Sequence, residues 1–307
     1  MSNTPTISFA KIAAPKKIAC VVICPEGEKP SSLAPLADPE KILDVAAISA
    51  KFKGKSKSKL DVLAPSGSAA SRLVAIGAGD IDALKATDWM ALGGVTSAAL
   101  SGEEQVNVYF SADASAAAAF AQGYMLRSYK FDKYKTKKND DEKKPSKAQK
   151  LVIMLDEAAA ARKQWTANKS VAQGTILARD LVNEPANVLT PVEFAKRAAA
   201  LSSLGVEIET LTEKEMKKLK MAALLGVSQG SRNPPRMVVM KWNGGKAKDK
   251  PLAFVGKGVT FDTGGISIKP SGGMEDMKGD MGGAAAVTGL MHALAARKAK
   301  VNVIGII

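Results

Sequence analysis

Residues 255–286 combine a glycine-rich backbone with charged side chains, and this stretch constrains both the fold and the chemistry of the chain. It starts after the apolar run Leu252-Ala-Phe-Val255, which together with Gly256-Lys-Gly258 predicts the carboxyl end of a buried strand. A long alanine-rich helix is predicted from about Met281 to Lys298. Because glycine has no side chain, the main chain between these two elements can approach closely any ligand or ion that the charged side chains bind.

Four charged residues lie in this stretch beside elements predicted to be buried, namely Lys257, Asp262, Lys269 and Asp280. A buried charge needs a partner, so we expect the four to be paired or to bind an ion. Each also has a simpler interpretation. Asp262 starts the turn signal Asp-Thr-Gly-Gly, Asp280 stands where the N-cap of the following helix would stand, and either lysine fits an ordinary surface position.

Taken together, the two aspartates point to a pair of divalent cations, because hard cations prefer carboxylate oxygens. A lysine can join such a site only as the neutral amine. The sole histidine, His292, stands among small and apolar residues in the predicted helix and is interpreted as a core or interface residue. With a single histidine, the sequence hardly supports a mechanism that pairs serine or cysteine with histidine. Any hydrolysis would depend on carboxylates and metal.

The apolar runs of the chain are short. The longest of them, at residues 18–24, 151–155 and 301–307, fall far below the roughly 18 to 20 residues that a membrane span needs. The N-terminus lacks the pattern of a signal peptide. With 46% hydrophobic residues and a mean hydropathy of −0.03, the composition is that of a soluble globular protein without a membrane partner, which we expect in the cytoplasm.

Cys20 and Cys24 share one extended run, Ile18-Ala-Cys-Val-Val-Ile-Cys24. Residues four apart on a strand are about 13 Å apart, which is too far for a disulfide. We therefore expect two buried free thiols.

The net charge of +14 raises the question of nucleic-acid binding. Only eight of the 44 basic residues are arginine, the residue that favours bidentate recognition of phosphates and bases. Much of the excess lies in residues 51–59 and 129–150, both interpreted as solvated lysine-rich segments. Weak DNA binding by electrostatic attraction stays an open alternative.

Strands and helices alternate along the first half of the chain, which predicts an α/β fold with a parallel or mixed sheet. The sequence Gly77-Ala-Gly79 closes one of these strands but lacks the third glycine of a dinucleotide-binding fingerprint. We expect strands at residues 6–11, 17–24, 59–63, 72–76, 105–110 and 150–155, and helices at 39–50, 82–100 and 113–128.

A long helix at roughly residues 156–182 is expected to link a first domain, residues 1–155, to a second α/β domain, residues 183–307. It should end at Asn183-Glu-Pro185, because proline disfavours helix at the preceding residue. Thr190-Pro191 should open the next helix as N-cap and first position. In the second domain we expect helices at 191–204 and 212–219, strands at 206–210, 236–242 and 251–255, and a loop of small residues at 224–231.

Several blocks of the second half resemble the leucyl aminopeptidase family of two-metal exopeptidases. The first block is Val255-Gly-Lys-Gly-Val-Thr-Phe-Asp-Thr-Gly-Gly-Ile-Ser-Ile-Lys-Pro270, followed by Met277-Lys-Gly-Asp-Met-Gly-Gly-Ala-Ala-Ala-Val287. Asn183-Glu-Pro-Ala-Asn-Val-Leu-Thr-Pro191 and Leu225-Gly-Val-Ser-Gln-Gly-Ser231 are similar to further blocks. The first 155 residues resemble the family's macro-like N-terminal domain in pattern only, and the resemblance implies a catalytic domain with a mixed central sheet.

The resemblance implies a role for each residue of the site. Lys257 and Asp280 would be terminal ligands of one metal ion, and Asp262 would bridge two ions, usually zinc or manganese. Lys269 would bind substrate and act catalytically by stabilising the tetrahedral intermediate. Met277 would line the pocket for the first side chain of a peptide substrate. The family also implies a hexamer.

One family block, Asn-Thr-Asp-Ala-Glu-Gly-Arg, does not occur in this sequence. It would supply two further metal ligands and the arginine that holds a bicarbonate. The chain stops in the apolar run Val301-Asn-Val-Ile-Gly-Ile-Ile307, an unusual terminus, since chain ends normally lie at the surface. We therefore expect a truncated chain with about half of a metal site and little activity alone.

Three hypotheses follow from the sequence. The first is a metal-dependent aminopeptidase that releases leucine-like residues from the N-terminus of peptides. The second is a DNA- or nucleotide-binding module that uses the basic N-terminal domain. The third is a non-catalytic scaffold. Metal dependence of activity would separate the first from the others, and salt-sensitive binding to DNA would support the second.

Overall fold

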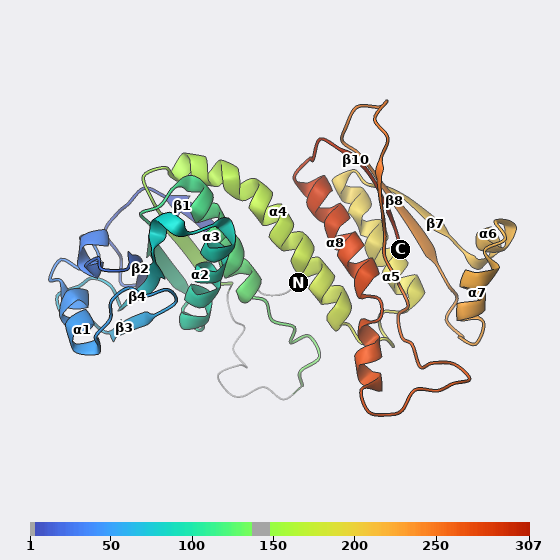
Figure 1. The fold of residues 1–307 in the computed structure, drawn as a ribbon, viewed down its shortest axis with the longest axis horizontal. Coiled ribbons are helices and arrows are strands. Elements are labelled where there is room, and N and C mark those ends of the chain that lie inside the picture. Colours follow the sequence, from blue (N-terminus) through green and yellow to red (C-terminus); the bar gives the residue numbers. More distant parts are fainter. Residues whose placement is uncertain (1–3, 137–147) are drawn as a thin grey trace. The chain divides into compact units, whose positions relative to one another are not determined.

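A computed structural model describes residues 4–136 and 148–307. The chain divides into two compact units, Met1–Lys169 and Ser170–Ile307. Each unit contains one mixed β-sheet and several helices (Figure 1), so the predicted α/β class is confirmed. The domain limits that we expected from the sequence, and the macro-like character of the first domain, stay predictions.

The first unit is built on a six-stranded sheet with the order β1-β6-β5-β2-β4-β3. Neighbouring strands run parallel except β3, which runs antiparallel to β4. The strands are β1 (Thr6–Ala10), β2 (Ala19–Pro25), β3 (Lys59–Leu63), β4 (Arg72–Gly79), β5 (Gln105–Tyr109) and β6 (Lys150–Met154).

The centre of this sheet is apolar because β2 and β4 are continuous runs of β-branched and small residues, the pattern of a strand covered on both faces. Cys20 and Cys24 are buried in β2 and both are free, as predicted. Burial raises the pKa of the Cys20 thiol to about 12 and that of the Cys24 thiol to about 11, the latter with help from Glu28 and Asp44.

Two helices of the first unit pack closely because glycine lies at their contact. A methyl group on Gly93 would collide with the main chain of Phe120, and one on Gly123 would collide with the main chain of Met90. The first unit contains η1 (Pro30–Leu33), α1 (Ile42–Ala50), η2 (Ile81–Ala83), α2 (Ala86–Ala99) and α3 (Ala114–Arg127); α4 (Ala158–Asn183) contains the boundary between the units.

The second unit is built on a four-stranded sheet with the order β7-β8-β10-β9. β8 runs antiparallel to both β7 and β10, whereas β9 runs parallel to β10. The strands are β7 (Glu207–Leu211), β8 (Met237–Asn243), β9 (Leu252–Val255) and β10 (Asn302–Ile306).

The helices of this unit begin and end close to the predicted signals. α4 ends at Asn183, directly before Glu-Pro, and Thr190 caps the next helix by accepting a hydrogen bond from the backbone NH of Glu193. The helical elements are α5 (Pro191–Ala199), η4 (Ala200–Leu204), α6 (Glu213–Lys218), α7 (Ala222–Ser228), η5 (Met274–Gly279) and α8 (Gly282–Ala296).

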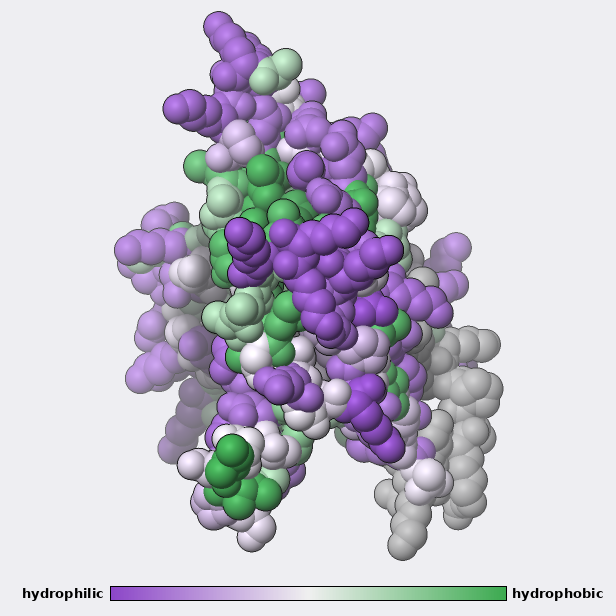
Figure 2. Space-filling model, turned by 90° about the vertical axis from the view of Figure 1, so that its right-hand side faces the viewer, coloured by the Kyte–Doolittle hydropathy of each residue, from purple (hydrophilic) through white to green (hydrophobic). Residues whose placement is uncertain are grey.

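Two expectations for the second unit are wrong. The residues predicted as a loop at 224–231 lie largely in α7, which none of our expected helices included. The strand at Leu252–Val255 exists but is exposed along its whole length, because β9 is an edge strand with β10 as its only partner among the described residues. Figure 2 shows hydrophobic areas among hydrophilic ones on the face that is on the right in Figure 1.

No helix within residues 4–136 and 148–307 is long and apolar enough to cross a membrane. The lysine-rich segment at 51–59 is exposed and irregular over most of its length, as expected. Of the second lysine-rich segment, residues 137–147 lie outside the described residues, and the preceding residues 130–136 are mostly exposed.

Candidate functional site

The glycines around Lys257 bring the end of β9 against the start of α8. The NH of Gly256 donates to the carbonyl oxygen of Ile306 at 2.9 Å, and the NH of Ala284 donates to the carbonyl oxygen of Lys257 at 2.9 Å. A side chain on Gly256 would collide with the main chain of Gly283 and Ala284. The absence of a side chain at Gly256 therefore permits this approach.

This approach places Lys257 beside Asp280. The Nζ atom of Lys257 lies 2.6 Å from Oδ1 of Asp280. The interpretation of Asp280 as a helix N-cap is wrong, because α8 begins one residue later with Met281 at the cap and no side-chain cap bond. Asp280 instead ends the short helix η5.

The second carboxylate oxygen of Asp280, Oδ2, is buried and accepts no hydrogen bond from any described residue. A carboxylate oxygen withdrawn from water without a partner is costly, so this atom fits a position that receives a cation.

Asp262 is held by its own turn and by Lys269. Its Oδ1 atom accepts a hydrogen bond from the NH of Gly264 at 2.8 Å, which confirms the predicted turn, and Gly264 has the left-handed φ of +95° that the turn requires. Its Oδ2 atom lies 2.8 Å from Nζ of Lys269. The Lys269 ammonium first, and then the Gly264 NH, hold the pKa of the Asp262 carboxyl below its ordinary value.

Lys269 also contacts the short helix that precedes Asp280. Its Nζ atom lies 3.1 Å from the sulfur of Met277, and its backbone NH donates to the carbonyl oxygen of Thr263 at 2.9 Å. The NH of Asp280 in turn donates to the carbonyl oxygen of Met277 at 3.2 Å. Met277 therefore touches both halves of the site.

The structure thus brings together all five residues that the sequence singled out. They form two lysine–aspartate pairs, and the charge of Lys257 also contributes to the low pKa of Asp262. The expectation that the charged residues lie beside buried elements is only partly right, because 60% of the Lys257 side chain is exposed but only 18% of that of Asp280.

The donor set suits a hard divalent cation but is small. Two carboxylates and one amine are present, and no group of three His, Cys, Asp or Glu residues occurs among the residues that the structure describes. The buried Oδ2 atom of Asp280, which has no partner among the described residues, and the Asp262 carboxylate are the kind of oxygen ligand that such a cation prefers.

His292 lies outside this set. It is half-buried in α8, and loss of hydration lowers the pKa of its imidazole. Its Nδ1 atom is buried without a hydrogen-bond partner among the described residues.

A supporting ion pair near the site was not predicted. Glu184, 3% exposed, lies 3.0 Å from the guanidinium of Arg197, and Lys278 of η5 reaches the carbonyl oxygen of Asn183 at 3.5 Å. The sequence singled out the Asn183-Glu-Pro block. It could not predict the contacts of this block with α5 and η5, because these contacts depend on the tertiary fold.

Two family models match the sequence. The model described as "Cytosol aminopeptidase family, N-terminal domain" matches residues 21–138, and the one described as "Cytosol aminopeptidase family, catalytic domain" matches residues 176–307.

Known proteins match over nearly all of the chain. The "Probable cytosol aminopeptidase" of Sinorhizobium fredii is 55% identical over 98% of this chain, and that of Rhizobium etli strain CIAT 652 is 53% identical over all of it. A tomato leucine aminopeptidase mutant has a similar structure (TM-score 0.79, 26% identity) over all of this chain and 63% of its own. The bottromycin maturation enzyme BotP in complex with Mn is also similar (TM-score 0.77, 26% identity) over 94% of this chain and 58% of its own.

The chain spans 62% and 63% of the length of the two curated relatives. Both family models are nevertheless matched in their expected order, and the candidate site lies in the part that matches the catalytic domain. The resemblance found in the sequence is confirmed: this chain belongs to the cytosol aminopeptidase family.

Proposed function

We propose that this chain provides part of the active site of a metal-dependent aminopeptidase that releases leucine-like residues from the N-terminus of peptides. Membership of the cytosol aminopeptidase family and the names of its relatives support a peptidase. The observation that carries the metal dependence is the buried Oδ2 atom of Asp280, which has no partner among the described residues.

Three residues would hold the metal. Lys257 and Asp280 would hold one ion, and Asp262 would help to hold both ions, manganese or zinc. The likeness to an enzyme in complex with Mn supports a divalent metal. When bound, such ions supply Lewis acidity toward a substrate carbonyl and an activated water.

The ion pairs indicate what the two lysines must do when metal binds. Lys257 would hold the ion through the neutral amine, next to the Asp280 carboxylate that it contacts here. The Nζ atom of Lys269 would turn from Oδ2 of Asp262 toward the oxygen of the scissile carbonyl, where negative charge develops. Met277, in contact with Lys269, would present an apolar wall to the first side chain of the peptide.

The wider properties of the family are part of the same proposal. We propose a cytoplasmic enzyme, in line with the name of its relatives, and a homohexamer, which only the sequence resemblance implies. A bicarbonate would need the arginine of the Asn-Thr-Asp-Ala-Glu-Gly-Arg block, which this sequence does not contain.

The test is hydrolysis of leucine amide by the protein that carries residues 1–307, before and after removal of metal and after return of Mn²⁺. We expect activity to require metal and to fall by at least about a hundredfold in Asp262→Asn, a loss in the range found for central catalytic groups. Asp276→Asn changes the same charge at an exposed neighbouring residue and should keep wild-type activity. Metal-independent hydrolysis, or full activity of Asp262→Asn, would contradict the proposal.

A further inference from the structure

The loop between α1 and β3 in the first unit has a second concentration of charge. Lys51, Lys53, Lys55, Lys57 and Lys59 occupy every second position, and no acidic residue lies between them. The aminopeptidase proposal assigns this loop no role.

The backbone of this loop is fixed by hydrogen bonds to the first sheet and its connections. The NH of Gly27 donates to the carbonyl oxygen of Lys53, and the NH of Gly79 donates to that of Gly54, at 3.1 and 2.9 Å. The NH of Lys57 donates to the carbonyl oxygen of Gly77, and the NH of Gly77 donates to that of Ser58, both at 2.8 Å. The lysine side chains therefore extend from an ordered support.

Glycine allows the loop to lie directly on the end of the sheet. A side chain on Gly54 would collide with the main chain of Pro25, at the end of β2, and one on Gly77, in β4, would collide with the main chain of Lys55. In open α/β sheets, ligands bind beyond the carboxyl ends of the parallel strands. The loop lies at such a position, where β2 and β4 end.

The charges of the loop are poorly compensated. Lys59 lies 3.2 Å from Asp61, but Asp61 also accepts two hydrogen bonds from Arg72, at 2.7 and 2.9 Å. The other four lysines make no ion pair with the residues that the structure describes. Four like charges within seven residues repel one another, and an anion would relieve that repulsion.

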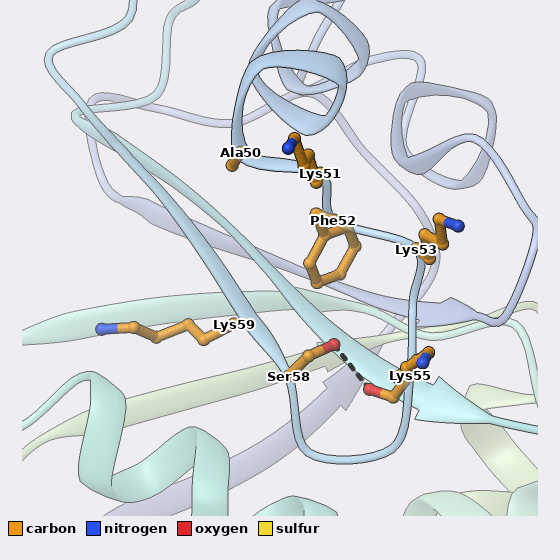
Figure 3. A pocket seen from close by; sticks show the side chains of 7 residues that line it. All are labelled: Ala50, Lys51, Phe52, Lys53, Lys55, Ser58 and Lys59. Carbon is orange, nitrogen blue, oxygen red and sulfur yellow. Dashed lines mark hydrogen bonds between the residues drawn. The ribbon is translucent and has the colours of Figure 1, made fainter.

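A cavity of about 330 Å³ opens beside these lysines. It is lined by Ala50, Lys51, Phe52, Lys53, Lys55, Ser58 and Lys59. In Figure 3 the ring of Phe52 points down into the space between the two arms of the loop, with Lys53 and Lys55 on one side and Lys59 extending away on the other. The hydroxyl of Ser58 donates to the carbonyl oxygen of Lys55 and braces the lower part of the loop. This volume is at the lower end of that of small-molecule sites.

We propose that this cavity binds a small ligand with two or more linked phosphate groups. Several linked phosphates carry enough negative charge to face three or four ammonium groups at once. Lysines with compact, freely turning ammonium groups suit phosphate oxygens. The ring of Phe52 packs against the core of the first unit, and its remaining exposed part offers an apolar surface beside the lysines. The ligand is either a nucleoside polyphosphate, whose base would stack on Phe52, or a free polyphosphate.

The test is calorimetric titration of the full chain, freed of divalent cations, with tripolyphosphate and with ATP at constant ionic strength. We expect saturable binding of at least one of them. The triple variant Lys51→Ser, Lys53→Ser, Lys55→Ser should bind at least about tenfold more weakly, since each surface ion pair contributes modestly and three are lost. Removal of metal keeps the outcome independent of the candidate metal site.

A matched control occurs in the second unit. Lys246, Lys248 and Lys250 are exposed and have the same alternate spacing, so their replacement by serine removes the same charge from residues that do not line this cavity. This control should bind within about twofold of wild type. If both triple variants lose affinity equally, or if neither phosphate compound binds better than sulfate, the proposal is wrong. If the two triple variants lose the same affinity for duplex DNA, that DNA binding comes from general charge attraction and not from this cavity.

Two further variants guard against misfolding and identify the ligand. Replacing the three loop lysines with arginine keeps the charge and should keep the binding, which a loss of structure would not allow. Phe52→Leu should weaken ATP binding alone if the ligand is a nucleoside polyphosphate. If it leaves ATP and tripolyphosphate binding unchanged and equal, the ligand is a free polyphosphate.

Discussion

The ammonium of Lys257 lies 2.6 Å from the carboxylate of Asp280, 23 residues further along the chain. The contact exists because the end of β9 and the first turn of α8 approach until their backbones touch at Gly256 and Gly283. Two residues that the sequence places on separate elements thus become neighbours through a backbone contact that only glycine permits.

A methyl group at Gly256 should break this approach. Gly256→Ala would force the main chain of Gly283 and Ala284 away, and we expect a loss of about 1–3 kcal/mol in the free energy of unfolding, as for overpacked sites. Gly258→Ala is the matched control on the other side of Lys257. Its new methyl group would make ordinary contacts with the Ala284 Cβ atom at 3.4 Å and the Ile307 main chain at 4.0 Å, so we expect a change within about 0.5 kcal/mol. Urea unfolding of both variants measures the difference, and equal stabilities would contradict the argument.

Lys269→Met should raise the pKa of Asp262. The hydrogen bond from Lys269 is the largest cause of the low pKa of this carboxyl, and methionine keeps the length of the side chain without the charge. Because the folded-state pKa lies below the unfolded value, the pair stabilises the fold fully above about pH 4 and loses this effect as pH falls through the folded pKa. NMR titration of the Asp262 carboxyl carbon should show the rise. An unchanged pKa would mean that the Gly264 NH dominates.

Adjacent glycines on α2 should respond in opposite directions. Gly93→Ala would push a methyl group into the main chain of Phe120 and should destabilise the protein by about 1–3 kcal/mol. The methyl group of Gly94→Ala makes ordinary contacts with the Arg127 Cβ atom at 3.7 Å and the Gly123 carbonyl oxygen at 3.9 Å, so the better helix propensity of alanine should stabilise the protein by up to about 1 kcal/mol. Thermal unfolding of the two variants gives the comparison, and destabilisation of both by the same amount would show that the α2–α3 contact does not decide the effect.

The two thiols should be unreactive in the native protein. Burial raises the pKa of Cys20 to about 12 and that of Cys24 to about 11, so at pH 8 almost no thiolate is present at either residue. We expect an aromatic disulfide reagent to label neither residue in the folded chain and both in concentrated urea. Rapid labelling of the native chain would show that β2 opens readily.

The candidate site could be found from the sequence because its chemistry is concentrated in one glycine-rich stretch. Residue type and spacing identified Lys257, Asp262, Lys269 and Asp280, the family resemblance added Met277, and the structure brings the five together. The choice of partners could not be predicted. Whether Asp280 faces Lys257 or caps α8 depends on how closely β9 and α8 pack, and this is a tertiary contact.

Tertiary contacts also explain which parts of the fold could not be predicted from the sequence. Apolar runs located β2, β4 and β9 correctly, but a run of four apolar residues does not reveal how many neighbours the strand will have, and β9 is an exposed edge. The small residues of α7 resembled a loop because Gly226 and Ser228 lower helix propensity. The NH of Leu225 donates to the carbonyl oxygen of the N-cap residue Met221, and the NH of the C-cap residue Gln229 donates to that of Gly226, so both ends of this helix are held by hydrogen bonds.

Titration of the metal-free chain with Mn²⁺ tests most directly whether Asp280 and its neighbours bind a divalent cation. We expect saturable binding by wild type, binding at least about tenfold weaker in Asp280→Asn, and wild-type affinity in Asp276→Asn, whose exposed carboxylate lies outside the two ion pairs. If Asp280→Asn binds Mn²⁺ as tightly as wild type, the lysine–aspartate pairs are structural and the metal-centre assignment is wrong.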